Sequence, residues 1–226
     1  MATTFQRARS DEQRTLRRQT ILDTAAGMLQ EMPVAELSLN ELSRRVGLAK
    51  SNVLRYFDSR EAVLLELLAG SAREWLAHLA AELPAAVRRR ARFERRAEQL
   101  ASTIARSLAQ RPVLCDLMSA GPGVLEHNVS VESVTRYKLT ALADADVFTG
   151  LVRDALPEFS PEDAWRYTVG TWVMAAALWV HARPPEAVLA AQAADERLSR
   201  MRLDFTHTLE DHLTTLAIGL RARAAA

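Results

Sequence analysis

The sequence predicts an all-helical protein, and three observations support this fold class. Glycine makes up only 8 of 226 residues, Ile occurs three times while Ala and Leu dominate, and Pro or Gly separates runs with helical spacing. Such a composition favours helices, because strands are enriched in β-branched residues. We therefore expect three short helices, a linking fourth helix and a larger helical body.

The composition also limits the class of protein. The chain is 49% apolar and 25% charged with a formal net charge of +1, which is typical of a soluble globular protein. A single cysteine, Cys115, excludes an internal disulfide framework. The longest near-apolar run, 169–180, is shorter than the roughly 20 residues that cross a bilayer. Residues 1–10 lack the apolar segment of a secretory signal. We expect a cytoplasmic protein with no membrane partner.

The first two helices are predicted from their caps. Ser10 or Asp11 caps the first helix, and Pro33 ends it because proline lacks the backbone N–H. Ser38 and Glu41 form a capping box at the start of the second helix. Gly47 follows within two turns and suits the left-handed position after a helix. The second helix is therefore short.

The third and fourth helices follow at once. The third is expected from Lys50 to about Phe57, with Val53 and Phe57 sharing its inner face. Asp58 or Ser59 caps the fourth, which we expect over 59–82.

The larger body follows Pro84. Prolines and a Gly-Pro-Gly sequence divide it into helices predicted over 93–110, 112–119, 130–156, 161–182 and 196–222.

The second and third helices with the turn at Gly47 have the sequence signature of a helix-turn-helix. A helix that enters the major groove of DNA needs an apolar inner face and an outer face of small and hydrogen-bonding residues. In 50–57, Val53 and Phe57 supply the inner face, and Ser51, Asn52 and Arg55 are expected to point outward. Lys50 and Tyr56 can reach phosphates.

Residues 18–68 resemble the DNA-binding domain of the TetR/AcrR family of bacterial transcriptional regulators. The resemblance rests on three consecutive motifs, SLNELS over 38–43, GLAKSNVLRYF over 47–57 and SREAVL over 59–64. Leu54 stands where many relatives carry a tyrosine that contacts phosphate, so we expect that contact to be lost.

The resemblance implies a DNA-binding domain over 10–60, the linking helix over 59–82, and a regulatory and dimerisation domain over 83–226. It implies phosphate contacts from Ser38, Lys50, Tyr56 and Arg60 and base contacts from Ser51, Asn52 and Arg55. Arg44 and Arg45 are candidates for further backbone contacts, although a solvated surface role explains them equally well. The basic residues Arg7, Arg9, Arg14, Arg17 and Arg18 suit either an arm in the minor groove or a disordered tail.

Relatives of this kind dimerise through their last two helices. Trp165, Trp172 and Trp179 recur every seven residues and share one helix face. The last helix repeats apolar residues at steps of three and four. We take as dimer-interface candidates Trp172, Trp179, Phe205, Leu209, Leu213 and Leu216. A domain core built from the same stripes is the alternative interpretation.

A small-molecule effector is expected in the larger domain. The candidate ligand-binding residues are polarizable or amphipathic side chains of the middle helices: Cys115, Met118, His127, Tyr137, Trp165 and Met174. Core packing explains several of them at least as well.

An enzyme is the rival class. The chain contains no Gly-rich phosphate loop, no zinc-protease motif and no nucleophile elbow. Asp204, His207 and Asp211 share a helix face and could hold a metal, but ion pairs explain them better. We predict a homodimeric regulator without enzymatic activity, cofactor or metal, released as a repressor from a palindromic operator by its effector. The alternatives are an effector-independent DNA-binding protein and a helical enzyme.

Overall fold

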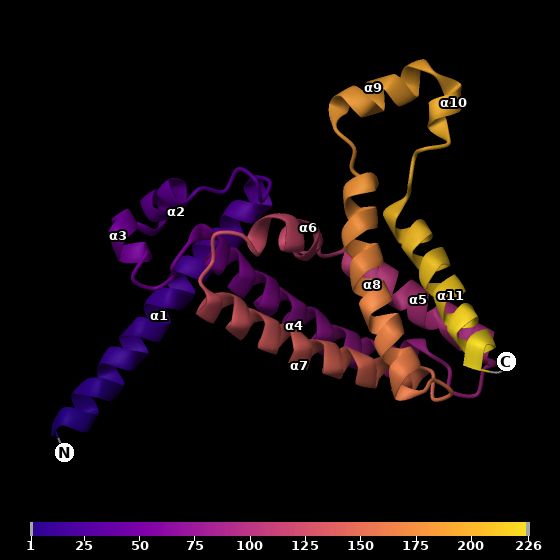
Figure 1. Ribbon diagram of the computed structural model, residues 1–226, viewed down its shortest axis with the longest axis horizontal. Coiled ribbons are helices and arrows are strands. Elements are labelled where there is room, and N and C mark those ends of the chain that lie inside the picture. The colour runs from indigo at the N-terminus through magenta and orange to yellow at the C-terminus, as the bar shows by residue number, and fades with distance from the viewer. Residues whose placement is uncertain (1, 225–226) are drawn as a thin grey trace. The chain divides into compact units, whose positions relative to one another are not determined.

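The computed structural model describes residues 2–224, with the side chains of residues 12–121 and 123–224. These residues form helices joined by turns and loops, with no strand among them. Figure 1 shows their order. The helices are α1 (Ala2–Glu31), α2 (Leu39–Val46), α3 (Lys50–Val53), α4 (Arg60–Ala86), α5 (Phe93–Ala109), α6 (Pro112–Ala120), η1 (Gly121–Leu125), α7 (Val131–Ala155), α8 (Pro161–His181), α9 (Glu186–Ala194), α10 (Glu196–Ser199) and α11 (Phe205–Ala224).

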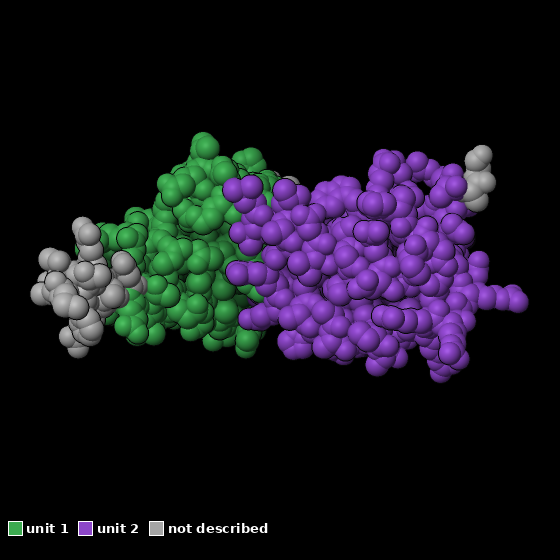
Figure 2. Space-filling model, turned by 90° about the horizontal axis from the view of Figure 1, so that it is seen from below, with its two compact units in different colours: residues 1–70, 120–138 green, residues 71–119, 139–226 purple. Residues whose placement is uncertain are grey.

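The chain divides into two compact units. Unit 1 holds the residues up to Gly70 together with Ala120–Lys138, and unit 2 holds Ser71–Ser119 together with the residues from Leu139 onward (Figure 2).

In unit 1, α2 packs against both α1 and α3. The caps of α2 confirm the prediction: the Ser38 hydroxyl accepts a hydrogen bond from the Glu41 amide at 3.1 Å, and Gly47 takes a left-handed φ of 71°. That φ strains any residue with a Cβ. The turn between α2 and α3 is therefore set by glycine.

In unit 2, α11 packs against α5 and α8. The core includes Trp75, whose indole N–H donates to the Ser107 hydroxyl at 2.9 Å and whose ring meets Phe148 edge-on at 5.2 Å. At Gly170 on α8, an added Cβ would lie 2.6 Å from a methyl carbon of Leu216. The close approach of α8 and α11 therefore depends on the missing side chain at Gly170.

Two predicted helix bounds near the N-terminus are wrong. The first helix begins at Ala2 rather than at Ser10 or Asp11, because no Gly or Pro interrupts the segment before it. The linking helix does not end before Pro84 but runs to Ala86. Pro84 removes only one amide donor close to the end of the helix. Burial of Leu83 beyond the predicted end favours the extra turn.

The helix predicted over 196–222 is also wrong. The segment forms α10 and, after a break, α11, while α9 was not predicted. Asp195 accepts a hydrogen bond from the Arg197 amide, and Asp204 accepts one from the His207 amide at 2.7 Å. Each aspartate therefore caps its own helix, which breaks the apolar repeat. Asp204 and His207, considered as metal ligands, are joined by this cap.

Candidate nucleic-acid interface

The outward face of α3 is the candidate interface, and its residues divide as the period predicts. Val53 and Phe57 are buried, at 0% and 4% exposure. Lys50, Ser51, Asn52 and Arg55 are exposed, and Tyr56 is half-buried. The structure thus brings an amide, a hydroxyl and two cations together on one short segment, over an apolar support.

The third helix is shorter than predicted, because α3 ends at Val53 and not near Phe57. Beyond Val53 the backbone changes to tighter turns, in which the amides of Arg55 and Tyr56 donate to the carbonyls of Asn52 and Val53. Ser and Asn are poor helix formers, and so short a helix gains little from propagation. Leu54 still has helical angles, with φ −63° and ψ −13°.

Arg18 of α1 holds this segment from behind. Its guanidinium donates to the Tyr56 carbonyl, pairs with the Glu66 carboxylate and lies over the Phe57 ring, 4.2 Å from the centroid. Arg18 therefore joins α1, the end of α3 and α4 within unit 1, which sequence reasoning missed when it placed Arg18 in a basic arm. Its spacing to Ile21 and Ala25 could have revealed it, because it extends their buried stripe.

The rest of the predicted basic arm divides. Arg14 and Arg17 are exposed on α1, whereas the side chains of Arg7 and Arg9 lie outside the described residues.

Two arginines of α2 are paired with acids. Glu41 accepts hydrogen bonds from Arg44 at 2.6 Å and from Arg45 at 3.0 Å, and Arg45 also reaches Glu31 at 2.6 Å. The hydrogen bonds from Arg44 and then Arg45 lower the pKa of Glu41 from 4.5 to about 2. The carboxylate is therefore charged at neutral pH, and it offsets part of the positive charge beside α3.

Arg60, predicted to contact phosphate, lies at the start of α4. Its guanidinium donates to the Val34 carbonyl and pairs with Glu61, and its side chain is only 20% exposed. These contacts join α4 to the loop after α1.

The predicted ligand-binding residues do not gather in one place. Cys115 and Met118 are buried in unit 2, where Trp165 is exposed and Met174 half-buried, whereas His127 and Tyr137 belong to unit 1. Burial raises the pKa of the Cys115 thiol to about 12, so it stays protonated and unsuited to nucleophilic chemistry.

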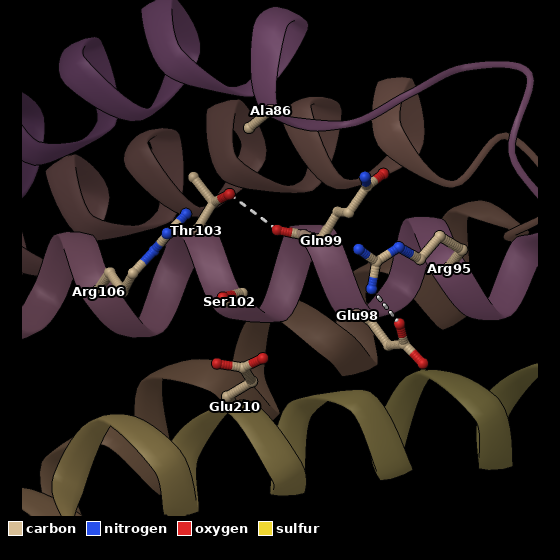
Figure 3. Close-up of a pocket in the computed structure, with 8 residues that line it drawn as sticks. All are labelled: Ala86, Arg95, Glu98, Gln99, Ser102, Thr103, Arg106 and Glu210. Atoms are coloured by element: carbon tan, nitrogen blue, oxygen red, sulfur yellow. Dashed lines mark hydrogen bonds and ion pairs between the residues drawn. The ribbon is translucent and has the colours of Figure 1, made fainter.

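A pocket of about 320 Å³ lies elsewhere in unit 2, on α5 with contributions from α4 and α11 (Figure 3). Its lining is polar and comprises Ala86, Arg95, Glu98, Gln99, Ser102, Thr103, Arg106 and Glu210. Arg95 and Glu98 pair with each other at 2.7 Å. Among the described side chains, those of Arg106 and Glu210 have no ion-pair partner.

Four of the predicted dimer-interface residues belong to the core of unit 2 instead. Leu209 and Leu213 are 0% exposed, and Trp179 meets Phe205 edge-on at 4.9 Å with both rings buried. Buried side chains have no surface left for a second subunit, so the prediction is wrong for these four. Trp172 and Leu216 are half-buried. The exposed apolar residues of α8 are Trp165, Val169, Val173 and Val180; we call this set the α8 apolar face.

Comparison with known families covers nearly the whole chain. Residues 21–67 match the model described as bacterial regulatory proteins, tetR family. Residues 69–224 match the model described as tetracyclin repressor-like, C-terminal domain. No helix of the described residues is long and apolar enough to cross a membrane.

Curated relatives share the N-terminal region. The HTH-type transcriptional regulator EthR of Mycobacterium tuberculosis is 42% identical over 48 residues, which is 21% of this chain and 22% of the relative. EthR of Mycobacterium bovis matches to the same extent. The chain thus matches about a fifth of the length of these relatives.

Solved structures share the fold over most of the chain. A possible TetR family transcriptional regulator from Streptomyces coelicolor has a TM-score of 0.61 at 19% identity, covering 91% of this chain and 98% of that one. A TetR regulator from Rhodococcus sp. RHA1 scores 0.55 at 15% identity, covering 94% and 98%. The regulator FadR from Bacillus subtilis, solved with stearoyl-CoA, scores 0.51 at 11% identity, covering 89% and 98%.

Proposed function

The chain belongs to the TetR family of bacterial transcriptional regulators, and on that premise we propose that it is a homodimeric repressor of a palindromic operator, released by a small molecule. The observation that carries the DNA-binding part is the outward face of α3, where Lys50, Ser51, Asn52 and Arg55 are exposed above buried Val53 and Phe57. A regulator of bacterial chromosomal DNA acts in the cytoplasm, which we propose as its location.

In this proposal, residues 10–60 bind DNA, 59–82 link, and 83–226 regulate and dimerise. Ser38, Lys50 and Tyr56 bind phosphates, and Ser51, Asn52 and Arg55 contact base edges. Arg44, Arg45 and Arg60 reach the DNA backbone only by sharing or leaving their acceptors within the protein, Glu41, Glu31 and the Val34 carbonyl. The weaker contacts are therefore assigned to these three arginines.

Dimerisation is proposed through the α8 apolar face. Four large apolar side chains at helical spacing lie exposed there, and Ile218 of the neighbouring α11 is exposed as well. Burying such a surface against a second copy is favourable in proportion to its apolar area. A two-fold dimer would place two α3 segments about 34 Å apart, one turn of DNA.

The effector is assigned to unit 2, and the pocket on α5 is our first candidate for its site. The charges of Arg106 and Glu210 suit a small polar molecule that carries a carboxylate, an amine or both. Binding that favours a conformation unfit for the operator must weaken DNA by the same coupling free energy.

Selection of duplexes from a random-sequence library by the purified chain tests the proposal. Enrichment of an inverted repeat, with half-sites about one helical turn apart, supports a dimeric repressor. Enrichment of a single half-site contradicts the dimer. Uniform, salt-sensitive binding without enrichment supports the alternative, an effector-independent DNA-binding protein. A metabolite screen for release of the enriched duplex then tests the effector, with Arg106→Ala as the variant expected to lose the response.

A further inference from the structure

Leu54 is an exposed apolar residue on the otherwise polar outer side of α3. It is 41% exposed, whereas its neighbour Val53 is fully buried. Among the described residues from 39 to 60, it is the one large apolar side chain with more than a third of its surface exposed. Lys50, Ser51 and Arg55 are exposed close by.

Local geometry places Leu54 beside the residues assigned to DNA. Its amide donates to the Lys50 carbonyl at 3.0 Å, so it completes a helical turn with Lys50 and lies one turn after Ser51. On a helix, residues three and four apart share a side. A duplex that reaches Lys50 and Ser51 therefore also covers Leu54.

We propose that Leu54 contacts the C5 methyl group of a thymine in each half-site and disfavours cytosine there. This inference rests on the proposed function and adds the base that this part of α3 reads. The thymine methyl is the apolar group that base pairs display in the major groove. Leucine cannot hydrogen-bond, so opposite the amino group of cytosine or adenine it would bury a donor without an acceptor, which is unfavourable. Thymine pairs the leucine with an apolar surface instead.

The probe is the duplex that the full-length chain enriches from the random library, with each thymine replaced singly by uracil. Uracil keeps the hydrogen-bonding groups of thymine and lacks only the methyl. We expect one position in each half-site at which the replacement weakens binding about fourfold, the effect of one buried methylene-sized group. At that position, 5-methylcytosine should bind more tightly than cytosine, because it restores the methyl.

Protein variants identify the side chain responsible. Leu54→Ala should weaken binding to the thymine duplex and abolish the difference between thymine and uracil, and Leu54→Met should keep the difference. Val131→Ala removes an exposed apolar side chain elsewhere in unit 1 and should change neither affinity. Far-UV circular dichroism checks that each variant is folded.

Two results would overturn the inference alone: equal affinity for thymine and uracil at every position, or a difference that persists unchanged in Leu54→Ala. If the chain enriches no duplex, the proposed function fails as well.

Discussion

The carboxylate of Asp58 accepts a hydrogen bond from the hydroxyl of Ser133, 3.0 Å away, and so connects the residue after Phe57 to the first turn of α7. The backbone amide of Ser130 donates to the same oxygen at 3.1 Å. Burial opposes ionisation of Asp58, but these hydrogen bonds prevail and hold its pKa below the usual value. The recognition segment is thus fastened to a helix more than 70 residues away in sequence.

Removing this contact should loosen the start of α7. In Asp58→Ala, we expect the amides of residues 130–134 to exchange with solvent several times faster, since a hydrogen bond contributes about 1 kcal/mol. Hydrogen exchange measures this directly. Glu36→Ala, which removes another exposed acid of unit 1, is the control. Equal exchange in Asp58→Ala and the native chain would show that the contact contributes nothing.

Lys50 and Asn52 should affect DNA binding in different ways. Lys50→Ala should weaken binding to operator and scrambled duplexes alike and reduce the salt slope by about 0.9, the loss of one phosphate contact. Asn52→Ala should also narrow the gap between the two duplexes, because it removes a base contact. A mobility-shift comparison at several salt concentrations decides; unchanged affinity for Lys50→Ala refutes its phosphate role.

Glu41→Gln should strengthen non-specific DNA binding, because it releases Arg44 and leaves Arg45 with Glu31 alone. The salt slope should steepen by about 0.9 for each new phosphate contact. Glu36→Gln changes the net charge equally at an exposed site and is the matched control. Similar gains for both variants would mean that net charge, and not release of the arginines, is responsible.

The pH dependence of that gain has a definite sign. A carboxylate with a lowered pKa stabilises the folded state above its ordinary pKa, and this contribution is lost as the pH falls through the lowered value. For Glu41 the loss lies between pH 4.5 and about 2. The difference between Glu41→Gln and the native chain should therefore stay constant from pH 5.5 to 8 in fluorescence anisotropy.

A charge on the α8 apolar face should dissociate the dimer. Val173→Glu places a carboxylate on an exposed residue of that face, which is unfavourable to bury against a second copy. Val147→Glu makes the same change on exposed α7. Sedimentation should show a monomer for the first variant and a dimer for the second. Dimers in both would place the interface elsewhere.

Substitution of Gly170 should cost stability that other helical glycines do not. Gly150→Ala meets no atom within 4 Å and should stabilise by up to about 1 kcal/mol through helix propensity. Gly170→Ala forces the Leu216 side chain to move and should gain less, and Gly170→Leu should destabilise by about 1–3 kcal/mol. Urea unfolding measures each. In a Leu216→Ala background Gly170→Ala should recover its gain; if it does not, Leu216 is not the obstacle.

Local signals predicted much of the fold. Ser38 and Gly47 bound α2 as expected, and α5 and α8 lie within one residue of their predicted ends, because caps and prolines act on adjacent backbone. The start of α1 and the break before α11 were missed, since several residues there could serve as caps.

The candidate site divides in the same way. Burial of Val53 and Phe57 followed from helical spacing, which needs only neighbouring residues. The contacts of Arg18 and Asp58 join partners 38 or more residues apart, and nothing in either motif names the partner. Leu209 and Leu213 were assigned to the dimer because an apolar repeat is the same whether a core or a second subunit covers it.

Arg18 also has a practical consequence. Its ion pair with Glu66 is about two-thirds shielded from solvent and is supported by the Tyr56 carbonyl and the Phe57 ring. Shielded charges respond to electrolyte far less than the exposed cations of α3 do. A concentrated wash should therefore elute the protein from a DNA-affinity column with its reading head still assembled, ready for a second cycle.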